Sequence, residues 1–375
     1  MSTATRTAVL VESGRPAPYA SSRPLEVMSL RLDPPGPGEL LVRVGAAGLC
    51  HSDLSVIDGS RPRPLPMALG HEAAGEVVAT GGGTEFAPGD HVVLAFVPAC
   101  GHCPHCAGGR PALCEPGAEA NGNGTLLGGG LRLTGADGGR PRHHLGVSAF
   151  SEHIVVSARS AVRVDPGLPF EIAALFGCAV LTGAGAAFHS ARVAPGDSVA
   201  VFGLGGVGLA ALIAAKAAGA ATLIAVDVVG SKRALARELG ATHAVAGGPD
   251  AVEAVREITR GGAEKVIDTT GVVAVLRQAY LATGRGGTTV TVGLPDPSRE
   301  LALPALSLVA EERTLKGSYL GSCVPRRDVP RFVSMYRSGI LPVDALLSHR
   351  LSLEEVNEGF DRLHTGEAVR QVIVF

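Results

Sequence analysis

One stretch near the middle of the chain restricts the possible folds more than any other. It reads PGDSVAVFGLGGVGLAALIAAKAAGAATLIAVDVV, residues 195–229, and contains an apolar run, a glycine turn, an alanine-rich segment and a second apolar run. This order predicts a βαβ unit, because two buried parallel strands need a helix to cross between them. No charged residue occurs from Val199 to Ala215, but the early glycines favour a strand, a turn and a buried helix over a membrane span.

The glycine turn predicts a dinucleotide site. The string GLGGVG fits G-x-G-x-x-G, although in a chain with 51 glycines the string alone is weak evidence. Here it follows a strand-like segment and opens a helix, and Asp227 lies 19 residues after Gly208 at the end of the next apolar run. That carboxylate can accept hydrogen bonds from both ribose hydroxyls of NAD and would repel the 2′-phosphate of NADP. We therefore expect NAD, held at Gly203, Gly205, Gly206, Val207, Gly208 and Asp227.

The two halves of the chain differ in their pattern of apolar runs. From about residue 180 apolar runs alternate with helical segments, which predicts an α/β fold with a doubly wound parallel sheet. The first third instead contains short strand-like runs such as LLVRVGAAGL and EAAGEVVAT, which predict an irregular β-rich domain. The glycine-rich segment 115–146 reads as a long loop or lobe. We expect late helices near 328–338 and 353–366, and a final strand that could return to the first domain.

Composition limits the classes of function. Hydrophobic residues make up 46% of the 375 residues and charged residues 18%, so the chain can bury a large core, and its length favours two domains. The formal net charge of −2 gives no electrostatic reason to expect a nucleic acid or a membrane surface as partner. Residues 1–10 lack the apolar core of a signal peptide, which predicts a cytoplasmic chain that starts here.

Four of the seven cysteines predict a structural metal site. They lie in CGHCPHCAGGRPALC at spacings of three, three and eight, and four thiolates this close can surround a tetrahedral zinc ion. An iron–sulfur cluster and two disulfides are the alternatives, but ferredoxin spacing differs and disulfides are rare in the cytoplasm. All four ligands are protein groups, so this site, in a lobe of about residues 97–116, should hold a loop. The ligands would be Cys100, Cys103, Cys106 and Cys114.

Three scattered residues are candidates for a second, catalytic zinc. Such a site needs three protein ligands and one open position. Cys50 in GLCHSD, His71 in LGHEAAG and Cys178 in LFGCAVLTGAG supply two thiolates and one imidazole. Each is weak evidence alone, since an apolar-flanked cysteine is usually a core residue. Together they are the ligand set that an alcohol-activating zinc requires. Cys323 is left without a role.

These motifs together resemble one known family. GLCHSD, LGHEAAG, the four-cysteine stretch, the GC ending in Cys178, GLGGVG with Asp227 and the tail HRLSLEEVNEGFDRLHTGEAVRQVIVF are similar to zinc-dependent medium-chain alcohol dehydrogenases over nearly the whole chain. Segment 115–146, with HHLGVSAFSEH, is similar to their longer, dimeric class I and class III branch. The resemblance implies a GroES-like catalytic domain at 1–180 and 325–375, and an NAD-binding Rossmann domain at 181–324.

The resemblance also implies roles around the metal. Cys50, His71 and Cys178 would ligate the catalytic zinc. Asp53 would orient His71, as ligating histidines generally require. Glu72 would lie behind the metal and enter its coordination during ligand exchange.

Further roles concern the substrate and the cofactor. Ser52 would hydrogen-bond the alcohol oxygen, and Phe96 would form an aromatic wall of the substrate pocket. His51 and Arg370 would contact the pyrophosphate, and Lys232 would approach the adenosine ribose.

The implied reaction interconverts alcohols with aldehydes or ketones and uses NAD. Zinc would lower the pKa of the bound alcohol, hydride would pass from the zinc-bound alkoxide to the nicotinamide, and the proton would leave through Ser52 and the ribose. In this branch a histidine three residues after the shuttle hydroxyl often ends that relay, and here the position is Ser55. We therefore expect slower proton release and a steeper pH dependence than in relatives with the histidine.

Two alternative functions stay open. One is a formaldehyde dehydrogenase that acts on a glutathione or mycothiol adduct. Class III enzymes carry acidic residues and an arginine where this chain has Arg61, Arg63 and Ala118, so that charge pattern is absent or inverted. The two arginines could instead favour an anionic substrate group or belong to a solvated loop. The other alternative is a non-catalytic zinc- and nucleotide-binding relative, which the intact ligand trio with Ser52 disfavours.

The end of the nucleotide domain predicts self-association. The segment LSLVAEERTLKGSYLG contains strand-like runs, and in the dimeric branch the matching strands pair across a two-fold axis. The resemblance therefore implies a homodimer, with one catalytic and one structural zinc ion per chain and a small alcohol or aldehyde as substrate.

Overall fold

The computed structural model describes residues 2–375 and divides the chain into two compact units. Unit 1 contains the chain up to Cys178 together with Val324–Arg331 and Leu347–Phe375. Unit 2 contains Ala179–Cys323 and Phe332–Leu346. The predicted division placed the whole tail from residue 325 with the first domain, whereas residues 332–346 group with unit 2.

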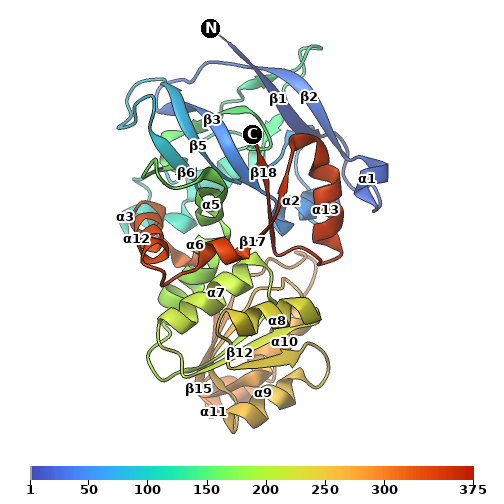
Figure 1. Cartoon of the computed structure of the whole chain (residues 1–375), viewed down its shortest axis with the longest axis vertical. Coiled ribbons are helices and arrows are strands. Elements are labelled where there is room, and N and C mark those ends of the chain that lie inside the picture. The colour runs from blue at the N-terminus through green and yellow to red at the C-terminus, as the bar shows by residue number, and fades with distance from the viewer. Residues whose placement is uncertain (1) are drawn as a thin grey trace. The chain divides into compact units, whose positions relative to one another are not determined.

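Unit 2 is built on a six-stranded sheet, of which β12 and β15 are labelled in Figure 1. The strand order is β13-β12-β11-β14-β15-β16, and every adjacent pair is parallel. Counted from β11, this is the order 3-2-1-4-5-6 of doubly wound dinucleotide-binding sheets, so the predicted Rossmann architecture is confirmed. The strands are β11 (Ser198–Phe202), β12 (Thr222–Asp227), β13 (His243–Ala246), β14 (Ala263–Asp268), β15 (Thr283–Thr291) and β16 (Thr314–Gly317).

Helices connect these strands, as parallel pairing requires. Helix α7 follows the glycine turn, and nine of its twelve residues are buried, which explains the apolar sequence that resembles a membrane span. The helices of unit 2 are α6 (Ala179–Gly185), α7 (Gly206–Ala217), α8 (Gly230–Glu238), α9 (Ala251–Thr259), α10 (Val273–Ala282) and α11 (Ala305–Ala310); α12 (Pro325–Arg337) has residues in both units.

Two sequence expectations need correction in secondary structure. The run Leu306–Ala310 was expected to be strand-like, but it belongs to helix α11, and only Thr314–Gly317 forms a strand. The segment 115–146 was expected to be a long loop or lobe, and the helix and strands in it were not predicted: it contains α4 (Glu115–Asn123) and the short strands β7 (Leu133–Thr134) and β8 (Arg142–His143). The apolar period of α4 is weak, and Gly117 and Gly122 hide it in the sequence.

Unit 1 is rich in β-structure, as expected. Its sheets have the orders β7-β2-β1-β4-β8 and β10-β6-β5-β3-β18-β17, with β9 also pairing β3. A large apolar core lies between them and includes Leu40, Val42, Val92 and Phe150. The remaining strands are β1 (Thr3–Leu10), β2 (Leu25–Leu32), β3 (Glu39–Gly48), β4 (Met67–Ala68), β5 (Glu72–Thr80), β6 (His91–Leu94), β9 (His153–Ser157), β10 (Ala161–Val164), β17 (Leu347–Leu351) and β18 (Arg370–Val374).

The C-terminal strand completes unit 1. In Figure 1 the red strand β18 lies beside the blue strand β3, and their register pairs Val372 with Gly48. The tail therefore does return to the first domain, and it brings Arg370 close to the end of β3. The helices of unit 1 are α1 (Tyr19–Ser22), α2 (His51–Ile57), α3 (Pro104–Ala107), α4, α5 (Phe170–Ala173) and α13 (Val356–His364).

The apolar helices α7 and α10 are only 12 and 10 residues long. Within residues 2–375, no single helix has both the length and the apolar character to cross a bilayer. One bent pair, Phe170–Gly177 with Ala179–Ala191, passes on length and composition alone, and most of its residues are buried in the fold.

Candidate active site

The three predicted ligands of the catalytic metal come together in unit 1. Cys50 is the N-cap of α2, His71 directly precedes β5, and Cys178 follows the helical turn Ala174–Gly177. Strands β3 and β5 pair with Gly48 opposite Glu72, so the register places Cys50 and His71 side by side. One ligand atom from each of the three residues lies within 4.8 Å of the others, and none of the residues is more than 7% exposed.

The donor atoms of this trio fit a zinc ion. Nε2 of His71 is buried and has no hydrogen-bond partner among residues 2–375, which is costly unless another group binds its lone pair. Hydrogen bonding to Cys178 and the positive charges of His71 and Arg370 hold the pKa of Cys50 well below its usual range despite burial. A buried thiolate beside a second thiol and an imidazole needs a cation. Two sulfurs and one nitrogen are a known ligand set for zinc with a fourth position open.

Asp53 supports His71, as the sequence predicted. It lies on the first turn of α2 and is completely buried. Its Oδ1 accepts a hydrogen bond from the backbone N–H of Gly70 at 3.0 Å and lies 3.2 Å from Nδ1 of His71. Burial opposes ionisation, but the charges and hydrogen bonds of His71 and His144 lower the pKa of Asp53 to about 2. The carboxylate therefore stays ionised and fixes the proton of His71 on Nδ1.

Glu72 and Arg370 form a buried ion pair beside the trio. Their side chains are 3.4 Å apart, and Arg370 also donates to the carbonyl of Leu49 at 2.9 Å. Burial disfavours the charged guanidinium, but Glu72, Cys50 and Cys178 together raise the pKa of Arg370. Arg370 was predicted to contact pyrophosphate. The structure shows instead that its charge faces Glu72 and the two thiols, and the cofactor contact stays a prediction.

The polar residues at the start of α2 differ in exposure. His51 is exposed and Ser52 is half-buried, so both can meet a ligand. The hydroxyl of Ser55 donates to the carbonyl of His51 at 2.8 Å. This bond commits the only proton of Ser55 to the helix backbone.

Phe96 lies against the metal site. Its ring meets the ring of His71 edge-on, with centroids 5.6 Å apart, and its carbonyl accepts a hydrogen bond from the amide of Asn121 at 3.0 Å. Asn121 and His144 were not singled out from the sequence. Both are buried polar side chains in the segment that was read as a loop, so no periodic pattern marked them.

The four clustered cysteines also form a metal-binding arrangement. One sulfur from each of them lies within 4.8 Å of the others, and Sγ of Cys100 and Sγ of Cys106 are 4.0 Å apart, too far for a disulfide. Backbone N–H groups point at the sulfurs: Cys103 donates to Cys100 at 3.3 Å, and Cys100 donates to Cys114 at 3.2 Å. Such bonds stabilise thiolate charge, so the cluster fits a tetrahedral zinc ion.

The predicted nucleotide turn has the required backbone in unit 2. Gly203 has φ +86°, which favours glycine, and Gly205 precedes the first turn of α7, which begins with Gly206, Val207 and Gly208. Asp227 accepts hydrogen bonds from the N–H groups of Leu204 at 2.6 Å and Val229 at 2.8 Å.

These two bonds hold the Asp227 carboxylate beside the glycine turn. Lys232, on α8, is 8% exposed, and burial lowers its pKa. The structure thus brings the glycines and Asp227 together, and the contact of Lys232 with the adenosine ribose stays a prediction.

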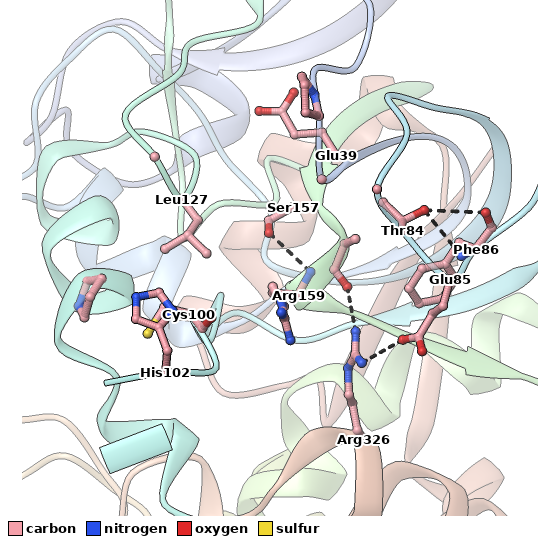
Figure 2. A pocket seen from close by; sticks show the side chains of 16 residues that line it. Glu39, Thr84, Glu85, Phe86, Cys100, His102, Leu127, Ser157, Arg159 and Arg326 are labelled. Carbon is pink, nitrogen blue, oxygen red and sulfur yellow. Dashed lines mark hydrogen bonds and ion pairs between the residues drawn. The ribbon is translucent and has the colours of Figure 1, made fainter. Parts of the chain in front are cut away.

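A cavity of about 660 Å³ lies elsewhere in unit 1 (Figure 2). Cys100 and His102 line it, and Arg326 reaches from α12 to Glu85 at 2.6 Å and to the carbonyl of Ala158 at 3.4 Å. None of the three catalytic ligand candidates lines it. This cavity is therefore separate from the candidate active site.

Comparisons with known proteins identify the family. The model of the alcohol dehydrogenase GroES-like domain matches residues 36–166, and that of the zinc-binding dehydrogenases matches residues 206–338. The chain is 41% identical to an NDMA-dependent alcohol dehydrogenase of Amycolatopsis methanolica, over 95% of this chain and 97% of that relative. The chain belongs to the zinc-dependent medium-chain alcohol dehydrogenases. It is an oxidoreductase that acts on alcohols.

Further alcohol dehydrogenases match at a similar level. A geraniol dehydrogenase of Castellaniella defragrans is 40% identical, over 94% of this chain and 95% of the relative. The crystal structure of benzyl alcohol dehydrogenase from Acinetobacter calcoaceticus has a TM-score of 0.92 at 34% identity, and covers 100% of this chain and 99% of its own. These matches confirm the predicted fold of a Rossmann domain with a GroES-like domain.

Proposed function

We propose that this chain oxidises small alcohols to aldehydes or ketones, reversibly, with NAD as the hydride acceptor. The buried trio Cys50, His71 and Cys178 carries the proposal, because Nε2 of His71 has no hydrogen-bond partner among the described residues. The glycine turn with Asp227 supports the cofactor assignment. A cytoplasmic location accords with seven unbridged cysteines, because thiols stay reduced there.

The chain's own residues would prepare the reaction. Zinc at the trio would act as a Lewis acid that lowers the pKa of an alcohol hydroxyl. Asp53 holds His71 in the tautomer that keeps Nε2 free for the metal. Ser52, at the start of α2, would accept the alcohol proton. Arg370 would balance the negative charge of Glu72 and the thiolates.

Asp227 is the reason to propose NAD over NADP. Its carboxylate is fixed by two backbone N–H groups at the turn and would repel a 2′-phosphate. A related zinc-binding dehydrogenase of Sinorhizobium meliloti, 26% identical with a TM-score of 0.80, was crystallised with NADP. The cofactor preference therefore has to be measured on this chain.

The thiol-adduct alternative draws support from two relatives. The chain is 38% identical to a class-3 alcohol dehydrogenase of Cereibacter sphaeroides and 36% identical to an S-(hydroxymethyl)glutathione dehydrogenase of Paracoccus denitrificans. Against it, Ala118 is exposed where class III enzymes carry an arginine, and Arg61 replaces an acidic residue. We therefore favour an uncharged alcohol substrate without a thiol cofactor.

The oligomeric state and metal content complete the proposal. We infer two zinc ions per chain, one at the trio and one at the four-cysteine cluster, and a homodimer. Leu306 and Val309 on α11 are 77% and 81% exposed, and large exposed apolar side chains that lie together often mark an interface.

A steady-state screen tests the function. Primary, secondary, aromatic and terpene alcohols are each assayed with NAD, with NADP, and with NDMA in place of added nicotinamide, and formaldehyde is assayed with and without glutathione or mycothiol. We expect alcohol oxidation with NAD. Activity seen only with NDMA would contradict the use of free NAD, and activity that requires the thiol would establish the alternative. Metal analysis that finds one zinc and no turnover would indicate a non-catalytic scaffold.

A further inference from the structure

His144 is a buried side chain that lies next to the proposed metal centre. Strands β4 and β8 run parallel with Ala68 opposite His143, so the residues that follow the two strands continue side by side. The backbone N–H of His144 donates to the carbonyl of Ala68 at 3.2 Å and to the hydroxyl of Ser148 at 3.1 Å. The side chain is 2% exposed. These bonds hold the backbone from which the buried imidazole projects.

The carboxylate of Asp53 is the polar neighbour of this ring. Nδ1 of His144 lies 2.9 Å from Oδ1 of Asp53, the same oxygen that accepts from Gly70 and lies beside Nδ1 of His71. The two imidazole rings stand at 88° to each other with centroids 5.4 Å apart. Asp53 is thus enclosed by two imidazoles and one backbone amide.

The protons in this group can be assigned from the chemistry of its members. An ionised carboxylate only accepts hydrogen bonds, so the nitrogens that face Asp53 must carry hydrogen. Both histidines then hold their proton on Nδ1. For His71 this leaves the lone pair on Nε2, the buried nitrogen without a partner among the described residues.

We propose that His144 is a positioning residue for the metal centre: it fixes the Asp53 carboxylate, and Asp53 in turn fixes the ring and the tautomer of His71. The inference deepens the proposed function, because it rests on a metal ion at Cys50, His71 and Cys178. Without the imidazole of His144 the carboxylate could turn in its site, and the ring of His71 would be held less firmly. Loss of a hydrogen-bond partner behind a ligating group typically lowers metal affinity about 10–100-fold.

A direct metal ligand is the competing role for His144. Donor atoms of Asp53, His71 and His144 also lie within 4.8 Å of one another. The carboxylate, however, already faces Nδ1 of both rings, and a metal ion between them would have to displace those protons. A third zinc ion per chain would establish this competing role and overturn the positioning role.

Three variants of the full chain test the proposal. His144→Phe keeps a ring but removes the donor, whereas His144→Asn places an amide N–H near the position of Nδ1. His143→Phe is the control, because the ring of that neighbouring buried histidine contacts Ser148 and accepts from the N–H of Arg132 at 3.1 Å, away from Asp53. The rate at which each protein loses zinc to a chelator is followed with a zinc-sensitive dye. Cobalt(II) at the trio gives an absorption spectrum that reports its ligand geometry.

The expected results separate positioning from packing. His144→Phe should release one of the two zinc ions at least about tenfold faster and shift the cobalt spectrum, while the second zinc is unchanged. His144→Asn should stay within about threefold of the unsubstituted chain, and His143→Phe should lower the unfolding midpoint without selective zinc loss.

Two results would overturn the proposal: equal zinc loss in His144→Phe and the unsubstituted chain, or equal loss in the Phe and Asn variants. These readouts do not depend on turnover. A chain that holds zinc at the trio but oxidises no alcohol would contradict the proposed function and leave the role of His144 intact.

Discussion

At the scale of single residues, the candidate site is a set of side chains whose partners determine their chemistry. In GLCHSD four consecutive residues have four different surroundings: Cys50 faces the other two candidate metal ligands, His51 is exposed, Ser52 is half-buried and Asp53 is completely buried. Proximity in sequence is therefore a poor guide to shared function here. The two residue-scale predictions concern positions where one functional group is decisive.

Asp227→Gly should change the choice of cofactor. Removing the carboxylate removes its repulsion of the 2′-phosphate, so the ratio of kcat/KM with NAD to kcat/KM with NADP should fall about tenfold or more. The substitution also removes the bonds to Leu204 and Val229, so overall activity will drop. The ratio is the informative measurement, since general damage to the turn affects both cofactors. An unchanged ratio would refute the role of Asp227.

Ser55→His should make the dependence of kcat on pH less steep. In the native chain the Ser55 hydroxyl is bonded to the carbonyl of His51 and cannot pass a proton onward. An imidazole with a pKa near 6.5 is a neutral base above that pH and can take the proton where hydroxide is scarce, so kcat near pH 7 should rise several-fold while kcat near pH 9 stays similar. Ser55→Ala is the control and should keep the steep profile. If the profile of Ser55→His matches that of the alanine variant, the relay ends elsewhere.

At the scale of elements, glycines set how closely backbones approach. The turn into α7 is one case: a Cβ on Gly208 would lie 1.8 Å from the carbonyl oxygen of Gly203, whereas a Cβ on Gly205 would meet nothing within 4 Å. The fold therefore requires a glycine at position 208, whereas Gly205 borders open space at the N-terminus of α7.

These two glycines should respond differently to substitution. Gly208→Ala should lower the free energy of unfolding by about 1–3 kcal/mol, because two backbone segments must separate. Gly205→Ala should change it by less than about 1 kcal/mol yet weaken NAD binding about tenfold, because the methyl group occupies the approach of the pyrophosphate. Urea unfolding and NAD titration measure the two effects. Equal NAD affinity in Gly205→Ala and the native chain would place the pyrophosphate elsewhere.

Helix α4 offers a second matched pair at the four-cysteine cluster. The N–H of Gly117 donates to Sγ of Cys114 at 3.4 Å, and a Cβ there would lie 2.5 Å from the carbonyl oxygen of Pro98. Gly117→Ala should therefore reduce zinc retention at the cluster and the thermal midpoint. Gly122→Ala, where a Cβ meets nothing within 4 Å, should stabilise the helix by about 0.5–1 kcal/mol. Identical zinc content and stability in both variants would argue against a metal-linked role for the first turn of α4.

At the scale of the whole molecule, the prediction is self-association. We expect a light-scattering mass of about twice the 38.0 kDa of one chain. Replacing Leu306 and Val309 on α11 with serine should shift the mass towards one chain, because both side chains are largely exposed. Ile340→Ser, at an exposed position outside α11, is the control and should leave the mass unchanged. A native mass near one chain would contradict the dimer.

The order of the elements could be predicted from sequence, because local patterns encode it. The apolar runs around GLGGVG determine a βαβ unit, since each run can only be buried as a strand or a helix. The cysteine spacing likewise restricts Cys100, Cys103, Cys106 and Cys114 to one small region. Helix α4 was not predicted, because its two glycines and its weak apolar period are typical of a loop sequence.

The partners of the buried polar groups were decided only by the tertiary structure. His144 meets Asp53 because β4 and β8 happen to run parallel, and Arg370 meets Glu72 because β18 pairs with β3. Both contacts join residues far apart in the chain, and pairing register depends on the packing of whole sheets rather than on any local pattern. The sequence by itself determined which groups could bind metal and nucleotide. The folded chain decided which side chains hold them in place.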